Sequence, residues 1–237
     1  MNMRFDIVYY EPAALDYFLG KALKEKFSDI PWVEIESHNY IPELTAKSNR
    51  EFTKLKNHLI IGIRKTHKYT PNHKVSDWLV PYTSSGCKAM CLYCYLVCNY
   101  NKCAYLRLFV NREKMLDRLI KKADAAPEPQ TFEVGSNSDL ILENVITDNL
   151  RYTIERFAQE GRGHLTFPTK FDMVEPILNL DHKGKTIVRM SVNPQEIIRR
   201  VELGTSPLHA RIDAINRIAE AGYPVGILIA PIILLPE

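Results

Sequence analysis

The stretch DWLVPYTSSGCKAMCLYC, Asp77–Cys94, decides how the fold is read. Its first part, Asp77–Tyr82, is a short apolar run typical of a strand. A loop follows in which Cys87, Cys91 and Cys94 stand four and then three positions apart. A strand that runs directly into such a loop places three thiols at the carboxyl end of that strand.

The composition is that of an ordinary globular protein. The 237 residues, 46% hydrophobic and 25% charged, suffice for one large domain or two small ones, and a net charge of +3 does not by itself indicate a polyanionic partner. We expect no signal peptide and no membrane segment, because Val225–Leu235, the most apolar stretch, is interrupted by Pro231 and is about half a bilayer span. We therefore expect a cytoplasmic protein, in which clustered cysteines indicate metal or redox chemistry.

Strands and helices alternate from Trp78 onward. The expected strands are Asp77–Tyr82, Gln130–Val134, His164–Phe167, Thr186–Met190 and Val225–Ile229. The expected helices are Arg112–Ala123, Leu140–Glu160, Phe171–Leu180, Gln195–Val201, and one that is capped by Ser206, has Pro207 at its first position and ends before Gly222. Five strand–helix units predict an α/β fold in which a parallel sheet has helices on its outside.

The N-terminal part lacks this alternation. Apolar residues at helical spacing predict a helix over Pro12–Phe27, and His58–Ile63 is typical of a strand, whereas the rest of Trp32–Pro71 is irregular. We expect an N-terminal α/β extension over residues 1–75 and a partial barrel over residues 76–237. A basic segment around Tyr69 is suited to contact phosphates, but is equally typical of a solvated loop. It contains Arg64, Lys65, His67, Lys68, His73 and Lys74. The two histidines are metal-ligand candidates, although lone histidines in a basic loop are more often simply exposed.

The ends of the expected strands carry polar or turn-forming residues. The segments are Gly135–Asp139, Pro168–Lys170, Ser191–Asn193 and Ala230–Pro231. Each alone is more often a helix cap than a ligand, but barrels of this class place their chemistry at the carboxyl ends of the strands. Together with the cysteine loop, these ends predict one shared site.

The C-x3-C-x2-C spacing of Cys87, Cys91 and Cys94 leaves two interpretations open. A zinc ion could be bound with Cys98 or Cys103 as the fourth ligand. Alternatively, the three thiolates hold a four-iron cubane cluster whose fourth iron stays open. The spacing, with the aromatic Tyr93 before the third cysteine, is the pattern of radical enzymes that use S-adenosylmethionine, so we favour the cluster.

Longer segments resemble the spore photoproduct lyase family, radical enzymes that repair a methylene-bridged thymine dimer in spore DNA. The resemblance rests first on SSGCKAMCLYCYL followed by AYLRLFVN. It continues through RKTHKY at Arg64–Tyr69, TFEVGSNSD at Thr131–Asp139, TKFDMVEPIL at Thr169–Leu178, GKTIVRMSVN at Gly184–Asn193, ELGTSPLHARIDA at Glu202–Ala214 and AGYPVGILIAPI at Ala221–Ile232.

The resemblance implies a fold, a reaction and partners. The fold is an open, partial (β/α) barrel of the radical S-adenosylmethionine type, related to the TIM barrel and short at its C-terminus. A reduced [4Fe-4S] cluster cleaves S-adenosylmethionine, and the 5′-deoxyadenosyl radical takes a hydrogen from the dimer so that its carbon–carbon bridge breaks. The partners are DNA containing thymine-dimer lesions and an electron donor such as a flavodoxin or ferredoxin.

The resemblance also assigns site residues. Cys87, Cys91 and Cys94 bind the cluster. The groups matched to the methionyl carboxylate and its neighbourhood are Ser138, Lys170 and Ser191, which suit charge-assisted hydrogen bonds. Those matched to the adenine are Tyr93 and Ala230, and Tyr95 matches a tyrosine that passes a hydrogen atom back to the substrate.

Two departures from the family pattern stand out. Ser136 replaces the cysteine that donates a hydrogen atom, and an O–H bond is much stronger than an S–H bond, so Cys98 together with Tyr95 becomes the candidate donor. The family also continues beyond Glu237 with a sixth strand and a lesion-wedging hairpin, so Val225–Leu235 is expected at a sheet edge. These departures keep two alternatives open: a radical enzyme on another nucleotide substrate, and a non-catalytic, metal-stabilised nucleic-acid-binding module.

Overall fold

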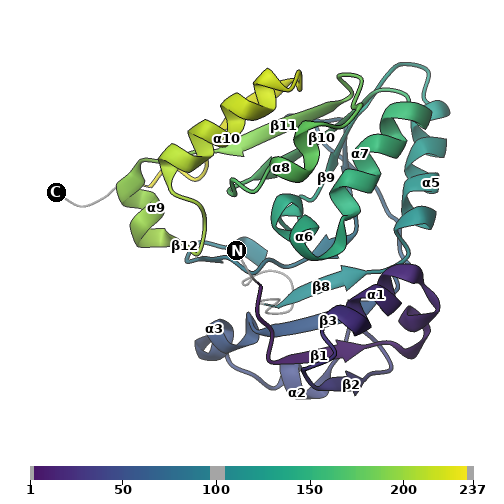
Figure 1. The fold of residues 1–237 in the computed structure, drawn as a ribbon, viewed down its shortest axis with the longest axis vertical. Coiled ribbons are helices and arrows are strands. Elements are labelled where there is room, and N and C mark those ends of the chain that lie inside the picture. Colours follow the sequence, from purple (N-terminus) through teal and green to yellow (C-terminus); the bar gives the residue numbers. More distant parts are fainter. Residues whose placement is uncertain (1–2, 97–104, 234–237) are drawn as a thin grey trace.

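The computed structural model describes residues 3–96 and 105–233 (Figure 1). These residues form a five-stranded sheet, a six-stranded sheet and a two-stranded ribbon. In Figure 1 the five-stranded sheet lies at the bottom of the view, and the six-stranded sheet with its helices lies above it. No helix among the described residues is long and apolar enough to cross a bilayer.

The five-stranded sheet has the order β2-β1-β3-β8-β6. Its strands are β1 (Ile7–Tyr10), β2 (Trp32–Glu34), β3 (His58–Gly62), β6 (Ser84–Ser85) and β8 (Leu106–Phe109). The first four in spatial order are parallel, and β6 runs antiparallel to β8. The predicted strand at His58–Ile63 is confirmed, and its centre, Leu59–Ile61, is fully buried. The sequence analysis did not predict β1 and β2, and it did not predict that β8 joins this sheet.

Short helices border the N-terminal sheet: η1 (Pro12–Asp16), α1 (Phe18–Lys26), α2 (Pro42–Thr45), η2 (Asn49–Glu51) and α3 (Phe52–Leu55). The single helix predicted for Pro12–Phe27 is therefore interrupted, because Tyr17 is extended with φ −90° and ψ 146°. The chain turns back tightly there. A β-carbon at Gly20 would lie only 1.9 Å from the carbonyl oxygen of Ala14.

The six-stranded sheet has the order β13-β11-β10-β9-β5-β4. Its strands are β4 (Thr70–Pro71), β5 (Trp78–Val80), β9 (Thr131–Val134), β10 (His164–Thr169), β11 (Thr186–Ser191) and β13 (Val225–Leu228). The five strands from β5 to β13 are parallel and adjacent in chain order, and β4 is antiparallel. The predicted parallel sheet is confirmed, and so is the position of its last strand at an edge.

The helices between these strands are α5 (Arg112–Asp124), α6 (Leu140–Thr147), α7 (Asn149–Glu160), α8 (Glu175–Leu178), α9 (Gln195–Val201) and α10 (Leu208–Glu220). The prediction of one helix over Leu140–Glu160 is wrong. Asp148 adopts the left-handed conformation with φ 59°, which separates α6 from α7. The side chain of Asn144 accepts hydrogen bonds from the backbone N–H groups of Leu150 and Arg151, so it caps the second helix.

The helix predicted after Ser206 is present as α10, but its predicted cap and the predicted length of another helix fail for a shared reason. The helix predicted over Phe171–Leu180 is confined to α8, and Ser206 does not cap α10. Instead, the Ser206 hydroxyl donates to the carboxylate of Asp172 and accepts from its backbone N–H at 3.1 Å. This pairing between distant segments holds the chain before α8 in a non-helical conformation, and it uses the hydroxyl that a cap would need.

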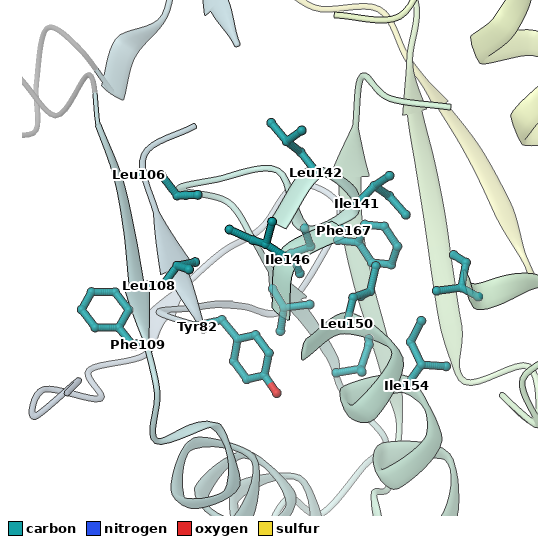
Figure 2. Close-up of a cluster of buried hydrophobic side chains, with 14 of the residues drawn as sticks. Tyr82, Leu106, Leu108, Phe109, Ile141, Leu142, Ile146, Leu150, Ile154 and Phe167 are labelled. Carbon is teal, nitrogen blue, oxygen red and sulfur yellow. The ribbon is translucent and has the colours of Figure 1, made fainter. Parts of the chain in front are cut away.

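One hydrophobic cluster joins the two sheets (Figure 2). Leu106 and Leu108 of β8 face a group of apolar side chains from α6, α7 and β10, whereas Phe109 points to the opposite side of the strand. That group contains Ile141, Leu142, Ile146, Leu150, Ile154 and Phe167. Tyr82 lies between the two sets, and its hydroxyl is hydrogen-bonded to Thr153 at 2.7 Å. The continuous core fixes the position of β8 relative to the strand ends that carry the predicted site.

A two-stranded ribbon connects the cysteine loop to the segment between α9 and α10. β7 (Met90–Cys91) pairs antiparallel with β12 (Glu202–Leu203), so that Cys91 is opposite Glu202. The backbone N–H of Leu92 extends the pairing by donating to the carbonyl of Val201 at 2.8 Å. The cysteine loop is thereby attached to the segment that follows α9, about a hundred residues later in the chain.

Candidate active site

The cysteine loop begins at Gly86, which has φ 80° and therefore occupies the region that favours glycine. The backbone N–H of Gly86 donates to the carbonyl oxygen of Asn137 at 2.8 Å. This bond attaches the start of the loop to the segment after β9. The turn thus directs Cys87 toward the strand ends rather than continuing β6.

Cys87, Cys91 and Cys94 are free thiols with intermediate exposure. Burial raises the pKa of Cys87 to about 12 and that of Cys91 to about 11. Both thiols would therefore be protonated at neutral pH unless a metal ion stabilised the thiolate. Cys87 interacts electrostatically with Cys91, and Cys91 with Cys94, so the three side chains are neighbours.

The described residues contain no group of three His, Cys, Asp or Glu side chains arranged to hold a single metal ion. A cubane cluster requires a different arrangement of ligands, because each cysteine binds a different iron atom. Cys87, Cys91 and Cys94 could supply three such attachment points.

Lys170 and Ser191 meet at the ends of β10 and β11. The Lys170 ammonium donates to the Ser191 hydroxyl at 3.0 Å, and it lies 5.9 Å from the centroid of the Tyr93 ring. Its backbone N–H donates to the Asp139 carboxylate at 3.0 Å. The structure therefore brings together Lys170, Ser191 and Tyr93, which the sequence analysis assigned to one site.

Ser138 belongs to a buried polar network. Its hydroxyl is 2.6 Å from the Ser84 hydroxyl, which is also hydrogen-bonded to the carboxylate of Glu143. Glu143 is 1% exposed and accepts a further bond from the Asn149 amide at 2.7 Å. Burial raises the pKa of Glu143 above its ordinary value despite these bonds. The network fixes the position of Ser138, and the sequence analysis missed its central carboxylate because Glu143 lies within a helical segment.

Glu202 is a second buried carboxylate that the sequence analysis did not single out. It accepts hydrogen bonds from the Tyr93 hydroxyl and, at 2.9 Å, from the Asn193 amide. Its other oxygen lies 2.7 Å from the Arg211 guanidinium. Burial acts to raise the pKa of Glu202, but the hydrogen bonds from Tyr93, Asn193 and Arg211 lower it below its ordinary value. The only signal in the sequence was the position of Glu202 at the start of ELGTSP.

Tyr95 and Ser136 are adjacent in the structure. The Tyr95 hydroxyl donates to the carbonyl oxygen of Ser136, and the Tyr95 side chain is about half exposed. The proposed thiol donor Cys98 lies outside the described residues, and so does Cys103. Ala230 follows β13 by two residues, and Leu228 at the end of β13 is paired with Ser191, so Ala230 lies near the same end of the sheet.

The basic segment lies elsewhere. Arg64 donates to the carbonyl of Tyr82 at 3.0 Å and stacks over the Phe109 ring at 3.9 Å, and burial lowers its pKa to about 10. It therefore has a structural role rather than an exposed phosphate-binding position. His67 and His73 line two different cavities, each of about 350 Å³, near the start of β5. The first is also lined by Tyr69, Trp78, Arg118 and Lys122.

Comparisons with known proteins agree with this arrangement. The sequence model of the family described as spore photoproduct lyase matches residues 3–237. The spore photoproduct lyase of Bacillus subtilis (strain 168) is 39% identical over 230 residues, which are 95% of this chain and 67% of that protein. The relative from Geobacillus sp. (strain Y412MC61) is 35% identical with the same coverage.

Solved structures give the same result. A spore photoproduct lyase complexed with dinucleoside spore photoproduct superposes with a TM-score of 0.90 at 33% identity, covering 98% of this chain and 69% of that one. A double mutant of spore photoproduct lyase with bound AdoMet and dinucleoside spore photoproduct superposes with a TM-score of 0.89. The chain spans about two thirds of the length of these relatives. With its sequence matched almost from end to end and its fold superposed over 98% of its length, the chain belongs to the spore photoproduct lyase family.

Proposed function

We propose that this protein repairs spore photoproduct in DNA, reversing the methylene-bridged thymine dimer by radical chemistry that depends on S-adenosylmethionine. The observation that carries the proposal is the convergence of the cysteine loop with Lys170, Ser191 and Tyr93 at one end of the parallel sheet. Family membership supports it, because solved relatives hold AdoMet and dinucleoside spore photoproduct.

We infer that the six-stranded sheet is an open, partial (β/α) barrel of the radical S-adenosylmethionine type. Five parallel strands adjacent in chain order, with helices between them, support this classification. We propose that residues 1–75 form an N-terminal extension and that residues 76–237 form the barrel region. Since β6 and β8 pair within the N-terminal sheet, the two regions share a sheet as well as a core.

Cys87, Cys91 and Cys94 would hold a [4Fe-4S] cluster. When bound, the cluster and S-adenosylmethionine supply the 5′-deoxyadenosyl radical that begins carbon–carbon bond cleavage. The pairing of β7 with β12 attaches the loop to the segment after α9 and would help to position the cluster.

Lys170 and Ser191 would bind the methionyl carboxylate of S-adenosylmethionine. The ammonium of Lys170 is already oriented by Ser191, and its backbone is held by Asp139, so little ordering is needed when the carboxylate arrives. Ser138 would add a hydroxyl that Ser84 and Glu143 keep in place.

Tyr93 and Ala230 would line the adenine. Because Glu202 accepts the hydrogen bond of the Tyr93 hydroxyl, the ring is held in a fixed orientation and offers a flat face. The adenine would therefore be bound by stacking on Tyr93 rather than by a hydrogen bond to its hydroxyl.

Return of a hydrogen atom to the product radical would involve Tyr95. Its hydroxyl lies beside the backbone of Ser136, at the position where the family has its donor cysteine. Since the Ser136 hydroxyl is a poor hydrogen-atom donor, we propose the Cys98 thiol as the donor that acts with Tyr95. The further partners would be lesion-containing DNA and a flavodoxin or ferredoxin as electron donor, in the cytoplasm.

The test is anaerobic reconstitution followed by incubation with dithionite, S-adenosylmethionine and dinucleotide spore photoproduct. We expect a brown protein with about four irons per chain, formation of 5′-deoxyadenosine, and release of thymine-containing product. Cleavage of S-adenosylmethionine without repair would favour a different nucleotide substrate. A colourless protein with one zinc ion would contradict the proposal and favour a metal-stabilised binding module.

A further inference from the structure

Lys56 is a buried lysine beside the cysteine loop. It directly follows α3, and only 3% of the residue is exposed to solvent. Its ammonium donates to the carbonyl oxygen of Cys87. The ion pairs found among the described residues do not include Lys56. A buried ammonium without a carboxylate partner is costly, which raises the question of what balances its charge.

The environment of the thiols gives the answer. Lys56 interacts electrostatically with both Cys87 and Cys91, from the side of the N-terminal sheet. Lys170 acts on Cys91 as well, but its ammonium is already hydrogen-bonded to Ser191 at the proposed S-adenosylmethionine site. Lys56 is thus a second cation near the thiols, and the proposed binding of S-adenosylmethionine does not use it.

The ammonium of the neighbouring Lys88 contacts the N-terminal region instead of the cysteine loop. The Lys88 ammonium donates to the carbonyl of Lys56 and to the side chain of Asn57, each at 2.6 Å, and lies 4.9 Å from the Phe5 ring. The two lysines cross between the cysteine loop and the N-terminal sheet. Both fasten the loop, but only Lys56 directs its charge to the loop and its thiols.

We propose that Lys56 compensates the negative charge of a cluster bound to Cys87, Cys91 and Cys94 and raises the reduction potential of that cluster. This inference rests on the proposed function. Reduction adds one electron, supplied by an external reductant such as dithionite, to a centre that three thiolates already make anionic. A fixed positive charge in a poorly hydrated environment stabilises the reduced form more than the oxidised form. Lys56 is therefore a positioning residue, because it acts through the cluster.

The experiment compares the midpoint potentials of reconstituted proteins, measured by dithionite titration with detection by electron paramagnetic resonance. Lys56→Gln keeps a hydrogen-bond donor for the Cys87 carbonyl but removes the charge. We expect full iron loading and a reduction equilibrium constant about tenfold lower, which is a potential about 59 mV more negative for one electron. Lys56→Arg, which keeps the charge, should stay close to the unmodified protein.

Lys88→Met is the matched control, because it loosens the same junction without removing the charge that faces the thiols. Lys54→Met removes an exposed lysine from α3, the short helix that precedes Lys56. Both should retain the original potential. If Lys56→Gln fails to take up iron while Lys56→Arg and Lys88→Met succeed, the charge is needed for assembly, which also supports the proposal.

Two results would overturn the inference. The first is full iron loading of Lys56→Gln with an unchanged potential, and the second is an equal shift, or an equal loss of iron, in Lys56→Gln and Lys88→Met. Neither result would affect the proposed function. An unmodified protein that binds no iron would instead overturn the proposed function, and this inference with it.

Discussion

Glu202 and Arg211 form an ion pair of 2.7 Å in which neither side chain is exposed to solvent. Arg211 also donates to the backbone carbonyls of Ser191, at 2.9 Å, and Ser206, at 2.8 Å. Glu202 accepts a hydrogen bond from the Tyr93 hydroxyl, and its backbone is paired with that of Cys91 in the ribbon of β12 and β7. One buried pair thus connects the cysteine loop, the end of β11 and the start of α10.

Removal of Glu202 should destabilise the protein strongly. Glu202→Ala leaves the Arg211 guanidinium buried without its partner, and losses of this kind cost about 3–5 kcal/mol. Urea unfolding followed by circular dichroism measures the effect. Glu196→Ala, which breaks only exposed pairs of α9, is the control and should change the free energy of unfolding by less than about 1 kcal/mol. Equal effects of the two substitutions would show that the buried pair is not important for stability.

The contribution of Glu202 should depend on pH in a defined direction. Its pKa in the folded protein is lowered from the ordinary value of 4.5, so the stabilisation is fully present above that value and is lost as the pH falls through the lowered pKa. The difference in unfolding free energy between the protein and Glu202→Gln should therefore be larger at pH 7 than at acidic pH. A difference that grows on acidification would contradict the assignment.

Three of the five cysteines should be essential for the cluster. Cys87→Ala, Cys91→Ala and Cys94→Ala should each abolish cluster assembly, because each removes one of three attachment points. Cys103→Ala, outside the spacing pattern, should assemble normally and is the matched control. Iron analysis and the visible absorption spectrum after anaerobic reconstitution measure the outcome. Full iron loading of Cys91→Ala would remove it from the ligand set.

Lys170→Ala should weaken binding of S-adenosylmethionine more than tenfold. A carboxylate that loses a charged hydrogen-bond partner costs about 1.5–3 kcal/mol. Isothermal titration calorimetry on the reconstituted protein measures the dissociation constant. Lys183→Ala, an exposed lysine before β11, should leave the affinity unchanged. Unchanged affinity in Lys170→Ala would exclude this residue from the site.

The hydrogen-atom donor can be identified with two substitutions assayed on dinucleotide spore photoproduct. Cys98→Ala should lower the yield of intact thymine product and increase trapped side products, because it removes the proposed S–H donor. Ser136→Cys should raise the yield, because it places a thiol next to Tyr95. An unchanged product ratio in Cys98→Ala would show that Cys98 is not the donor, and no gain in Ser136→Cys would show that position 136 does not face the substrate.

Local sequence patterns sufficed for the parallel sheet and for much of the candidate site. Alternating strands and helices have periods of two and 3.6 residues that are visible without the fold. Parallel strands in chain order bring their carboxyl ends to one edge, which is why Lys170 and Ser191, 21 residues apart, meet at 3.0 Å. The short spacing of Cys87, Cys91 and Cys94 keeps the three thiols neighbours on a single loop.

Features that depend on partners distant in the sequence were decided by the tertiary structure alone. Ser206 is a favourable capping residue by local rules, yet its hydroxyl is bonded to Asp172. The left-handed Asp148 divides a periodic helical segment, and Asn144 caps its second half. Nothing local marks Glu202 or Lys56 as parts of the site, since each acquires its role from residues that folding brings beside it: Arg211 and Tyr93 in one case, Cys87 in the other. A local pattern reports which face of an element is buried, but the partner of a buried charge is chosen only when the chain packs.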